Sequence, residues 1–130
     1  MSSTFLRSSL MIRVDTDDPE LESQLDSRVT YRGEYFTGEV TEMNGDVMVA
    51  LTTYRDGFED GPSVEWFPGG GKLSEGVVRK GIPVGPWRMW HVNGELAEEK
   101  VFDEAGTGCV VRIRRWSERG DPLPQRSSQG

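Results

Sequence analysis

Short apolar runs separated by glycine-containing turns are the dominant pattern along residues 29–120. The clearest runs are 46–54, 75–78 and 109–113, which are rich in β-branched and apolar residues without helical spacing. Such runs favour extended structure. Asn44-Gly45 and Asn93-Gly94 lie between runs of this kind, and Asn-Gly is a strong signal for a type I′ hairpin turn. The pattern therefore predicts consecutive β-hairpins.

The hairpin pattern repeats along the chain. Four glycines lie 23, 24 and 23 residues apart, namely Gly38, Gly61, Gly85 and Gly108. The fifth residue after each is apolar: Met43, Trp66, Trp90 and Ile113. A turn follows in each copy, at Asn44-Gly45, Gly69–Gly71, Asn93-Gly94 and, displaced, Arg119-Gly120. We expect an all-β antiparallel meander that shares one core. Trp66 and Trp90 are expected to be buried in it, so that replacing either with alanine costs about 3–5 kcal/mol.

Three regions differ in composition. Residues 1–28 form an acidic N-terminal segment, expected to be partly disordered, and its residues 18–25 allow a short helix because Asp17 can cap it and Pro19 suits the first turn. Residues 29–120 form the β-hairpin repeat domain. Residues 121–130 are rich in proline, serine and glutamine and are expected to be a disordered tail.

The central repeats resemble a known family. Residues 85–99, from Gly85-Pro86-Trp87 through Asn93-Gly94 to Glu98-Glu99, are similar to the MORN-variant repeat, roughly G-x-W-x-x-W/Y-x-x-N-G-x-L-x-x-E. Residues 61–75 form a second good copy. Arrays of this repeat look like the YwqK-type antitoxin family, and the resemblance covers residues 29–116. The first copy lacks the aromatic residue and the last is degenerate beyond Ile113, as terminal copies often are.

The resemblance implies an antitoxin or immunity protein that neutralises a partner toxin by stoichiometric binding. A general protein-interaction scaffold built from MORN-like repeats is the alternative, because fold alone does not fix function. A small enzyme is a third hypothesis and the one least favoured by the residues. The gene next to this one distinguishes the first two hypotheses, since a toxin gene there favours the antitoxin.

The charge of the chain narrows the choice of partner. Fifteen Lys and Arg residues stand against 22 Asp and Glu residues, a formal net charge of −7. An acidic chain is poorly suited to bind nucleic acid directly or an anionic membrane surface. It suits a basic protein partner, or it serves only to keep the protein in solution, which is the commoner reason for such a charge. With one cysteine and no apolar run long enough for an export signal or a membrane span, we expect a cytoplasmic protein.

The sequence has few residues or motifs of the kinds that catalyse reactions or bind metals and phosphates. His91 is the single histidine and is expected to be a structural strand residue, and Cys109 is expected to be a small packed apolar residue at the start of a strand. Gly69-Gly70-Gly71-Lys72 lacks the phosphate-binding loop pattern, and the acidic run 15–26 lacks that of a calcium loop. No Cys/His cluster has zinc-site spacing. The sequence therefore predicts no catalytic residues, no metal and no cofactor.

Two kinds of residue remain as candidates for partner binding. Acidic residues cluster at 56–65 and 95–104, and Trp87 and Trp116 lie outside the positions that the repeat assigns to the core. Tryptophan is enriched at interface hot spots. The predicted partner-binding residues are Asp56, Glu59, Asp60, Trp87, Glu98, Glu99 and Trp116. Arginines gather at 108–130, a basic end expected to pair with the acidic N-terminal segment or with an acidic partner.

Overall fold

The computed structural model describes residues 12–124, and every regular element among them is a strand. The strands are β1 (Arg13–Asp15), β2 (Leu21–Ser23), β3 (Val29–Tyr31), β4 (Glu34–Tyr35), β5 (Gly38–Asn44), β6 (Val47–Arg55), β7 (Phe58–Trp66), β8 (Lys72–Arg79), β9 (Ile82–Trp90), β10 (Leu96–Phe102) and β11 (Val110–Arg115). The all-β prediction is confirmed.

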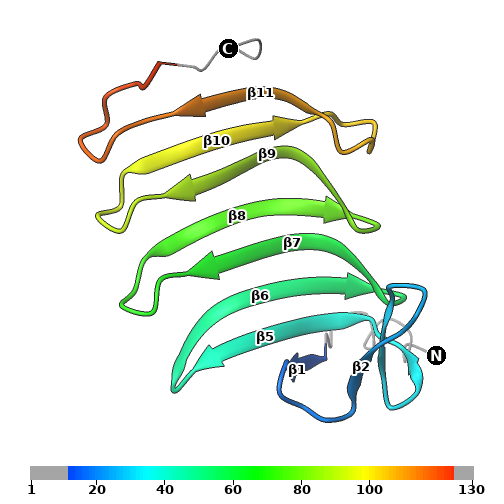
Figure 1. The fold of residues 1–130 in the computed structure, drawn as a ribbon. Coiled ribbons are helices and arrows are strands. Elements are labelled where there is room, and N and C mark those ends of the chain that lie inside the picture. The colour runs from blue at the N-terminus through cyan, green and yellow to red at the C-terminus, as the bar shows by residue number, and fades with distance from the viewer. Residues whose placement is uncertain (1–11, 125–130) are drawn as a thin grey trace, which may run out of the picture.

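Eight strands form one long sheet in the order β1-β5-β6-β7-β8-β9-β10-β11, and β2-β3-β4 form a small second sheet (Figure 1). From β5 onward each strand pairs antiparallel with the next along the chain, as the hairpin repeat predicts. β1 adds to the edge of β5 in parallel. Each of the six antiparallel pairs of the long sheet carries one register shift. Such bulges increase the twist of a sheet.

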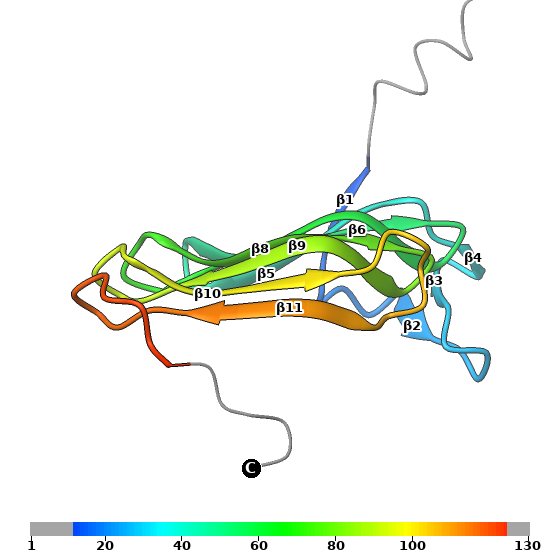
Figure 2. The same ribbon diagram turned by 90° about the horizontal axis from the view of Figure 1, so that it is seen from above.

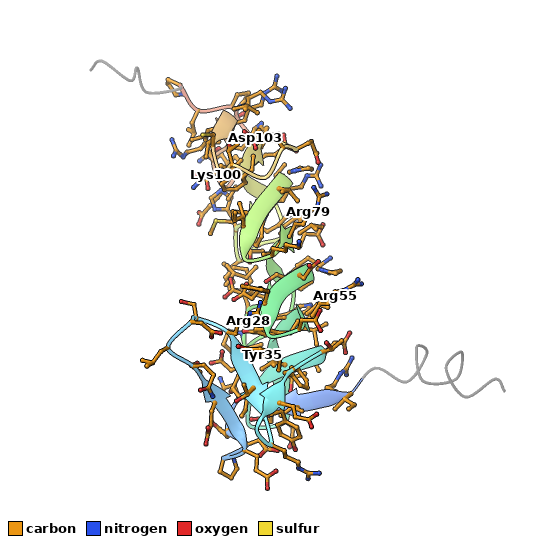
Figure 3. All side chains as sticks on the ribbon, turned by 90° about the vertical axis from the view of Figure 1, so that its right-hand side faces the viewer. Arg28, Tyr35, Arg55, Arg79, Lys100 and Asp103 are labelled. Carbon is orange, nitrogen blue, oxygen red and sulfur yellow. The ribbon has the colours of Figure 1, made fainter. Side chains whose placement is uncertain are left out.

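The long sheet is a single layer over most of its area. Seen from above it is a thin, twisted ribbon (Figure 2), and side chains project from both of its sides (Figure 3). We call the side on which the small sheet packs the inner face and the other side the outer face. Val40 and Tyr54 lie on the inner face and contact the small sheet. Figure 3 shows Lys100 on that side and Arg55 and Arg79 on the other.

A buried apolar cluster lies at one end of the molecule, and Val78 and Val84 are also buried, on β8 and β9. Phe36, 3% exposed, packs with Val14 and Val40 between the two sheets. Its ring meets those of Tyr31 and Tyr54 at centroid distances of 5.9 and 6.2 Å. Trp66 and Trp90 are partly buried, which agrees with their predicted burial, but neither belongs to this fully buried cluster. They lie where none of the strands described in residues 12–124 forms a second layer over the sheet.

The region 18–25 forms no helix. Leu21 instead lies in β2 and packs against the core. The Asp15 and Asp18 side chains accept hydrogen bonds from the backbone N–H groups of Asp17 and Glu20, at 2.8 and 2.9 Å. Aspartate bonds of this kind compete with helix formation. At the other terminus, the Leu123 N–H donates to the carbonyl of Arg115, and residues 125–130 lie outside the described residues.

The predicted turns are present, but their types differ from the expectation. Asn44 and Asn93 are not among the residues with positive φ, so neither Asn-Gly pair forms a type I′ turn. Both central residues have positive φ in Arg32-Gly33, between β3 and β4 of the small sheet, and in Asp56-Gly57 and Lys80-Gly81, at the other end of the long strands. Those three pairs meet the requirement of type I′ turns.

A three-residue loop closes three of the hairpins, with a glycine of positive φ at its third position: Gly70, Gly94 and Gly120. A tryptophan lies four residues before each glycine, at Trp66, Trp90 and Trp116. Each tryptophan pairs with the residue six positions later: Lys72, Leu96 and Pro122. Trp116 is therefore the third member of the repeat position that Trp66 and Trp90 occupy, rather than a residue outside the pattern.

Candidate functional site

Cross-strand register decides which side chains share a face. One row crosses the inner face through Glu42, Ala50, Glu65, Ser74, Met89, Glu98 and Arg115. A second row crosses the outer face through Asp15, Thr41, Leu51, Val64, Glu75, Arg88, Glu99 and Arg114. Residues that follow one another in a strand point to opposite faces.

The predicted acidic residues do not form one surface. Glu98 lies on the inner face, where its Oε2 accepts a hydrogen bond from Arg115 Nε at 2.8 Å. Glu99 lies on the outer face, and its Oε2 is 3.1 Å from Arg88 Nε. Each carboxylate is thus paired with an arginine. The outer row alternates in sign through Glu75, Arg88, Glu99 and Arg114, whereas the inner row holds Glu42, Glu65 and Glu98 before Arg115.

The other acidic candidates lie at the opposite end of the strands. Asp56 is in the β6–β7 turn, where its backbone N–H donates to Thr37 Oγ1 at 2.9 Å. Glu59 is exposed on β7 and faces Tyr54 across the strands. Burial, and next the Glu59 carboxylate, raise the pKa of Tyr54. Asp60 follows on β7 and is partly buried. Six residues separate Glu59 from Glu65, roughly 20 Å of strand.

Trp87 lies in the middle of the inner face and is half-buried. Its ring lies directly over Gly76, where a Cβ atom would be 2.1 Å from the nearest ring carbon. Its Nε1 donates a hydrogen bond to the Val77 carbonyl at 3.1 Å. Phe102 meets it edge-to-face, with ring centroids 6.4 Å apart. Gly76 therefore allows the indole to lie flat on the sheet, in a fixed position.

A shallow pocket of about 190 Å³ surrounds this indole. We call it the inner-face pocket, and its lining residues are Glu65, Ser74, Trp87, Met89, Glu98, Lys100 and Phe102. Met89 is 43% exposed. The Ser74 hydroxyl donates to Glu65 Oε1 at 2.8 Å, which orients one carboxylate of the rim. The pocket thus has an apolar floor and a rim with charges of both signs.

Sequence reasoning found two members of this pocket, Trp87 and Glu98, and missed the others. The spacing of the repeat could have identified two of the missed residues. Glu65 and Met89 each lie four residues after a repeat glycine, Gly61 and Gly85, and therefore occupy the same repeat position. Trp116 lies elsewhere, on the outer face beyond β11, and its carbonyl is 2.8 Å from His91 Nε2. His91 thus joins two neighbouring hairpin loops, but it lies just after β9 rather than in a strand. Cys109 is exposed just before β11, so the prediction that it packs as an apolar residue is wrong.

The long β10–β11 connection is stabilised from within. Hydrogen bonds from the Thr107 side chain and backbone lower the pKa of Asp103. A similar bond from the Tyr35 hydroxyl, at 2.6 Å, lowers the pKa of Asp26 in the small sheet. Arg28 stacks over the Tyr35 ring, 4.3 Å from its centroid. These bonds hold loops in place at the edges of the molecule rather than at the inner-face pocket.

Residues 12–124 contain no group of three or more His, Cys, Asp or Glu side chains arranged to hold a metal ion. No helix suited to crossing a membrane occurs in the same range. Comparisons with protein-family models, with curated proteins and with solved structures find no match to this chain.

Proposed function

We propose that this protein is an antitoxin or immunity protein that neutralises a partner toxin by stoichiometric binding across the inner face. The class of partner comes from the resemblance of residues 61–75 and 85–99 to MORN-variant repeats of antitoxins. The place of binding comes from the inner-face pocket. The proposed mechanism is occlusion of the partner, with no turnover by this chain.

The observation that carries the proposal is an uncovered aromatic floor on a rigid sheet. Trp87 is held by Gly76 below it, by a hydrogen bond to Val77 and by the edge of Phe102. An indole that is already fixed loses little side-chain entropy on binding. Tryptophan surrounded by groups that exclude water is the usual composition of a hot spot. Met89 beside it is adaptable in shape, so it can fit an irregular partner surface.

The charges of the rim suit a partner that brings both apolar and basic side chains. Glu65 and Glu98 lie in one row on either side of Ser74 and Met89. The chain as a whole carries a net charge of −7. Opposed surface charges accelerate association and exclude wrong partners more than they add affinity. We therefore expect the rim charges to determine specificity for the partner and Trp87 to determine the lifetime of the complex.

Co-purification from the native cell, followed by identification of the bound protein, tests the proposed function. We expect a one-to-one complex with a protein that arrests growth when it is expressed alone. Co-expression of the present chain should restore growth, and its Trp87→Ala variant should restore it less. A bound protein without toxicity, or a toxin that this chain binds without rescue, would contradict the antitoxin role.

Glu98 and Glu99 provide a matched pair for the kinetics of binding. Each is a glutamate of β10 paired with one arginine, but they lie on opposite faces. Glu98→Lys is expected to slow association several-fold and to flatten its dependence on salt, since rim charges act on the association rate. Glu99→Lys should leave both unchanged. Stopped-flow association across a salt series measures this, and equal effects of the two variants would refute binding through the inner face.

A further inference from the structure

Charge is distributed unevenly from one edge of the long sheet to the other. Residues 12–46, which form the small sheet, β1 and β5, hold ten carboxylates and three arginines, a net charge of −7. Residues 110–124, which form β11 and the segment after it, hold four arginines and two carboxylates, a net charge of +2. We call these the acidic end and the basic end.

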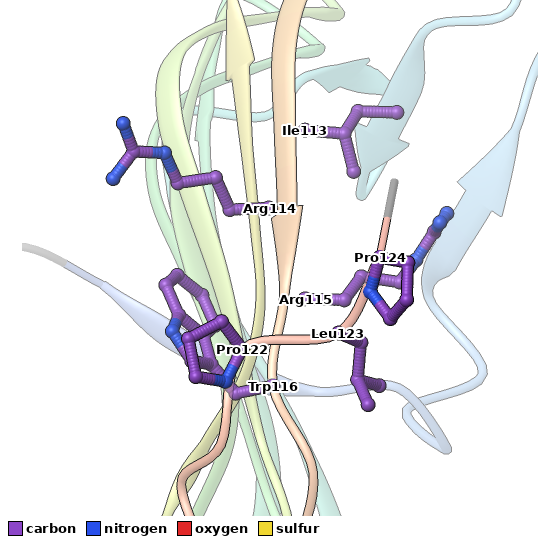
Figure 4. Close-up of a pocket in the computed structure, with 7 residues that line it drawn as sticks. All are labelled: Ile113, Arg114, Arg115, Trp116, Pro122, Leu123 and Pro124. Carbon is purple, nitrogen blue, oxygen red and sulfur yellow. The ribbon is translucent and has the colours of Figure 1, made fainter. Parts of the chain in front are cut away.

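The basic end has exposed arginines beside an apolar pocket. Arg112 and Arg114 are exposed on the outer face of β11, and neither forms an ion pair with another described residue. A pocket of about 260 Å³ lies along the outer edge of this strand (Figure 4). Trp116, Pro122 and Leu123 contribute to its lining, and Leu123 is 45% exposed. This end is suited to an apolar side chain that has acidic neighbours.

The acidic end presents a side chain of that kind. Leu25, in the β2–β3 loop, is as exposed as in an extended peptide, with a relative exposure of 106%. It borders a shallow depression on the small sheet together with Glu22, Asp26 and Glu34. Tyr35, 47% exposed, lies in the same depression. A fully exposed leucine among three carboxylates has no role in the core of its own chain.

Among residues 12–124, no ion pair or backbone hydrogen bond joins these two ends within one chain. The acidic end adjoins one edge of the long sheet and β11 is the other edge (Figure 1). Seven strand spacings separate β1 from β11, roughly 33 Å. The sequence-based expectation that the basic end pairs with the N-terminal segment of the same chain is therefore wrong. This distance is several times the Debye length of ~8 Å at physiological salt, so the charges of β1 and β11 are screened from each other.

We infer that the basic end of one copy binds the acidic end of a second copy, with Leu25 of one copy entering the pocket beside Trp116 of the next. The carboxylates around Leu25 then face Arg112 and Arg114. Because the two surfaces of this contact differ and lie at opposite ends, the contact is heterologous and repeats from copy to copy. The predicted assembly is an open head-to-tail chain. The inference does not depend on the proposed antitoxin role.

Sedimentation equilibrium of the full chain at low and high salt tests the inference. We expect the average mass to rise from 14.6 kDa through the dimer and beyond as concentration increases at low salt. High salt should return the protein to monomer, because the contact is largely electrostatic. A monomer at every concentration, a wild-type mass that stops at the dimer, or association that salt does not weaken would overturn the inference.

Variants at each end make the test specific. Leu25→Ser should weaken association about tenfold or more without affecting the fold, because its side chain is fully exposed. Arg112→Glu with Arg114→Glu should have the same effect from the other end. Arg55→Glu with Arg79→Glu, which makes the same change of charge at exposed positions on the outer face, away from the small sheet and from β11 (Figure 3), should associate like the wild type. A mixture of the Leu25 variant and the double arginine variant should form dimers only, and longer chains in that mixture would contradict the assigned surfaces.

Discussion

Replacing Gly76 with alanine is expected to lower the free energy of unfolding by about 3 kcal/mol and to abolish most of the partner binding. The new Cβ atom would lie 2.1 Å from the Trp87 ring, so the indole must leave its position. Overpacking of this kind costs roughly 1–3 kcal/mol. Loss of the Trp87 hydrogen bond to Val77 adds about 1 kcal/mol.

Gly69→Ala is the control for this substitution. Gly69 also lies in the β7–β8 hairpin, but an added Cβ atom meets nothing within 4 Å, and its φ is not positive. The free energy of unfolding of the Gly69→Ala variant is expected to change by less than about 0.5 kcal/mol. Urea unfolding followed by tryptophan fluorescence measures both variants. If Gly76→Ala is as stable as Gly69→Ala, the position of Trp87 on the sheet is not what the structure describes.

Replacing Phe36 with alanine is expected to cost about 3–5 kcal/mol, the usual loss for a buried phenylalanine. Phe36 is 3% exposed and contacts both sheets through the core cluster. The same truncation at half-buried Trp90 should cost less, in contrast to the expectation from sequence. Beyond the core, strands contact mainly their neighbours, as in other repeat proteins, so damage should remain local.

Hydrogen exchange checks the local character of the Phe36 effect. Amides of β3, β5 and β6 should lose protection in Phe36→Ala, whereas those of β8, β9 and β10 should keep theirs. Loss of protection spread evenly from β5 to β11 would show that the sheet unfolds as one unit. In that case the small sheet and its core would be required for the whole molecule rather than for one end of it.

Much of the fold could be predicted from the sequence because hairpin signals are local. Glycines at a fixed period and alternating apolar runs locate β5 to β10 without any knowledge of the tertiary structure. The alignment of the last repeat with the earlier ones was harder to predict from the sequence. The connection between β10 and β11 is longer than its counterparts, and counting forward from Gly108 therefore assigns the repeat position to Ile113 instead of Trp116. Counting back from the turn glycines finds it.

The site could be predicted only in part because charge clusters in sequence do not become clusters in space. Glu98 and Glu99 are neighbours in the chain, yet a strand sends them to opposite faces. The degree of burial also depended on tertiary arrangement. A repeating tryptophan is typical of a core, but none of the strands described in residues 12–124 forms a second layer over Trp66 and Trp90. The small sheet that forms the core has sequence features of a polar segment.

The most direct test of partner binding through the inner face compares two aliphatic residues of equal exposure. Met89 is 43% exposed on the inner face, and Val77 is 45% exposed on the outer face of the neighbouring strand. The dissociation constant of the co-purified partner should be measured by calorimetry for Met89→Arg and Val77→Arg. We predict affinity at least about thirtyfold weaker for Met89→Arg, a loss of about 2 kcal/mol, and no change for Val77→Arg. Wild-type affinity for Met89→Arg, or a larger loss for Val77→Arg, would contradict binding through the inner face.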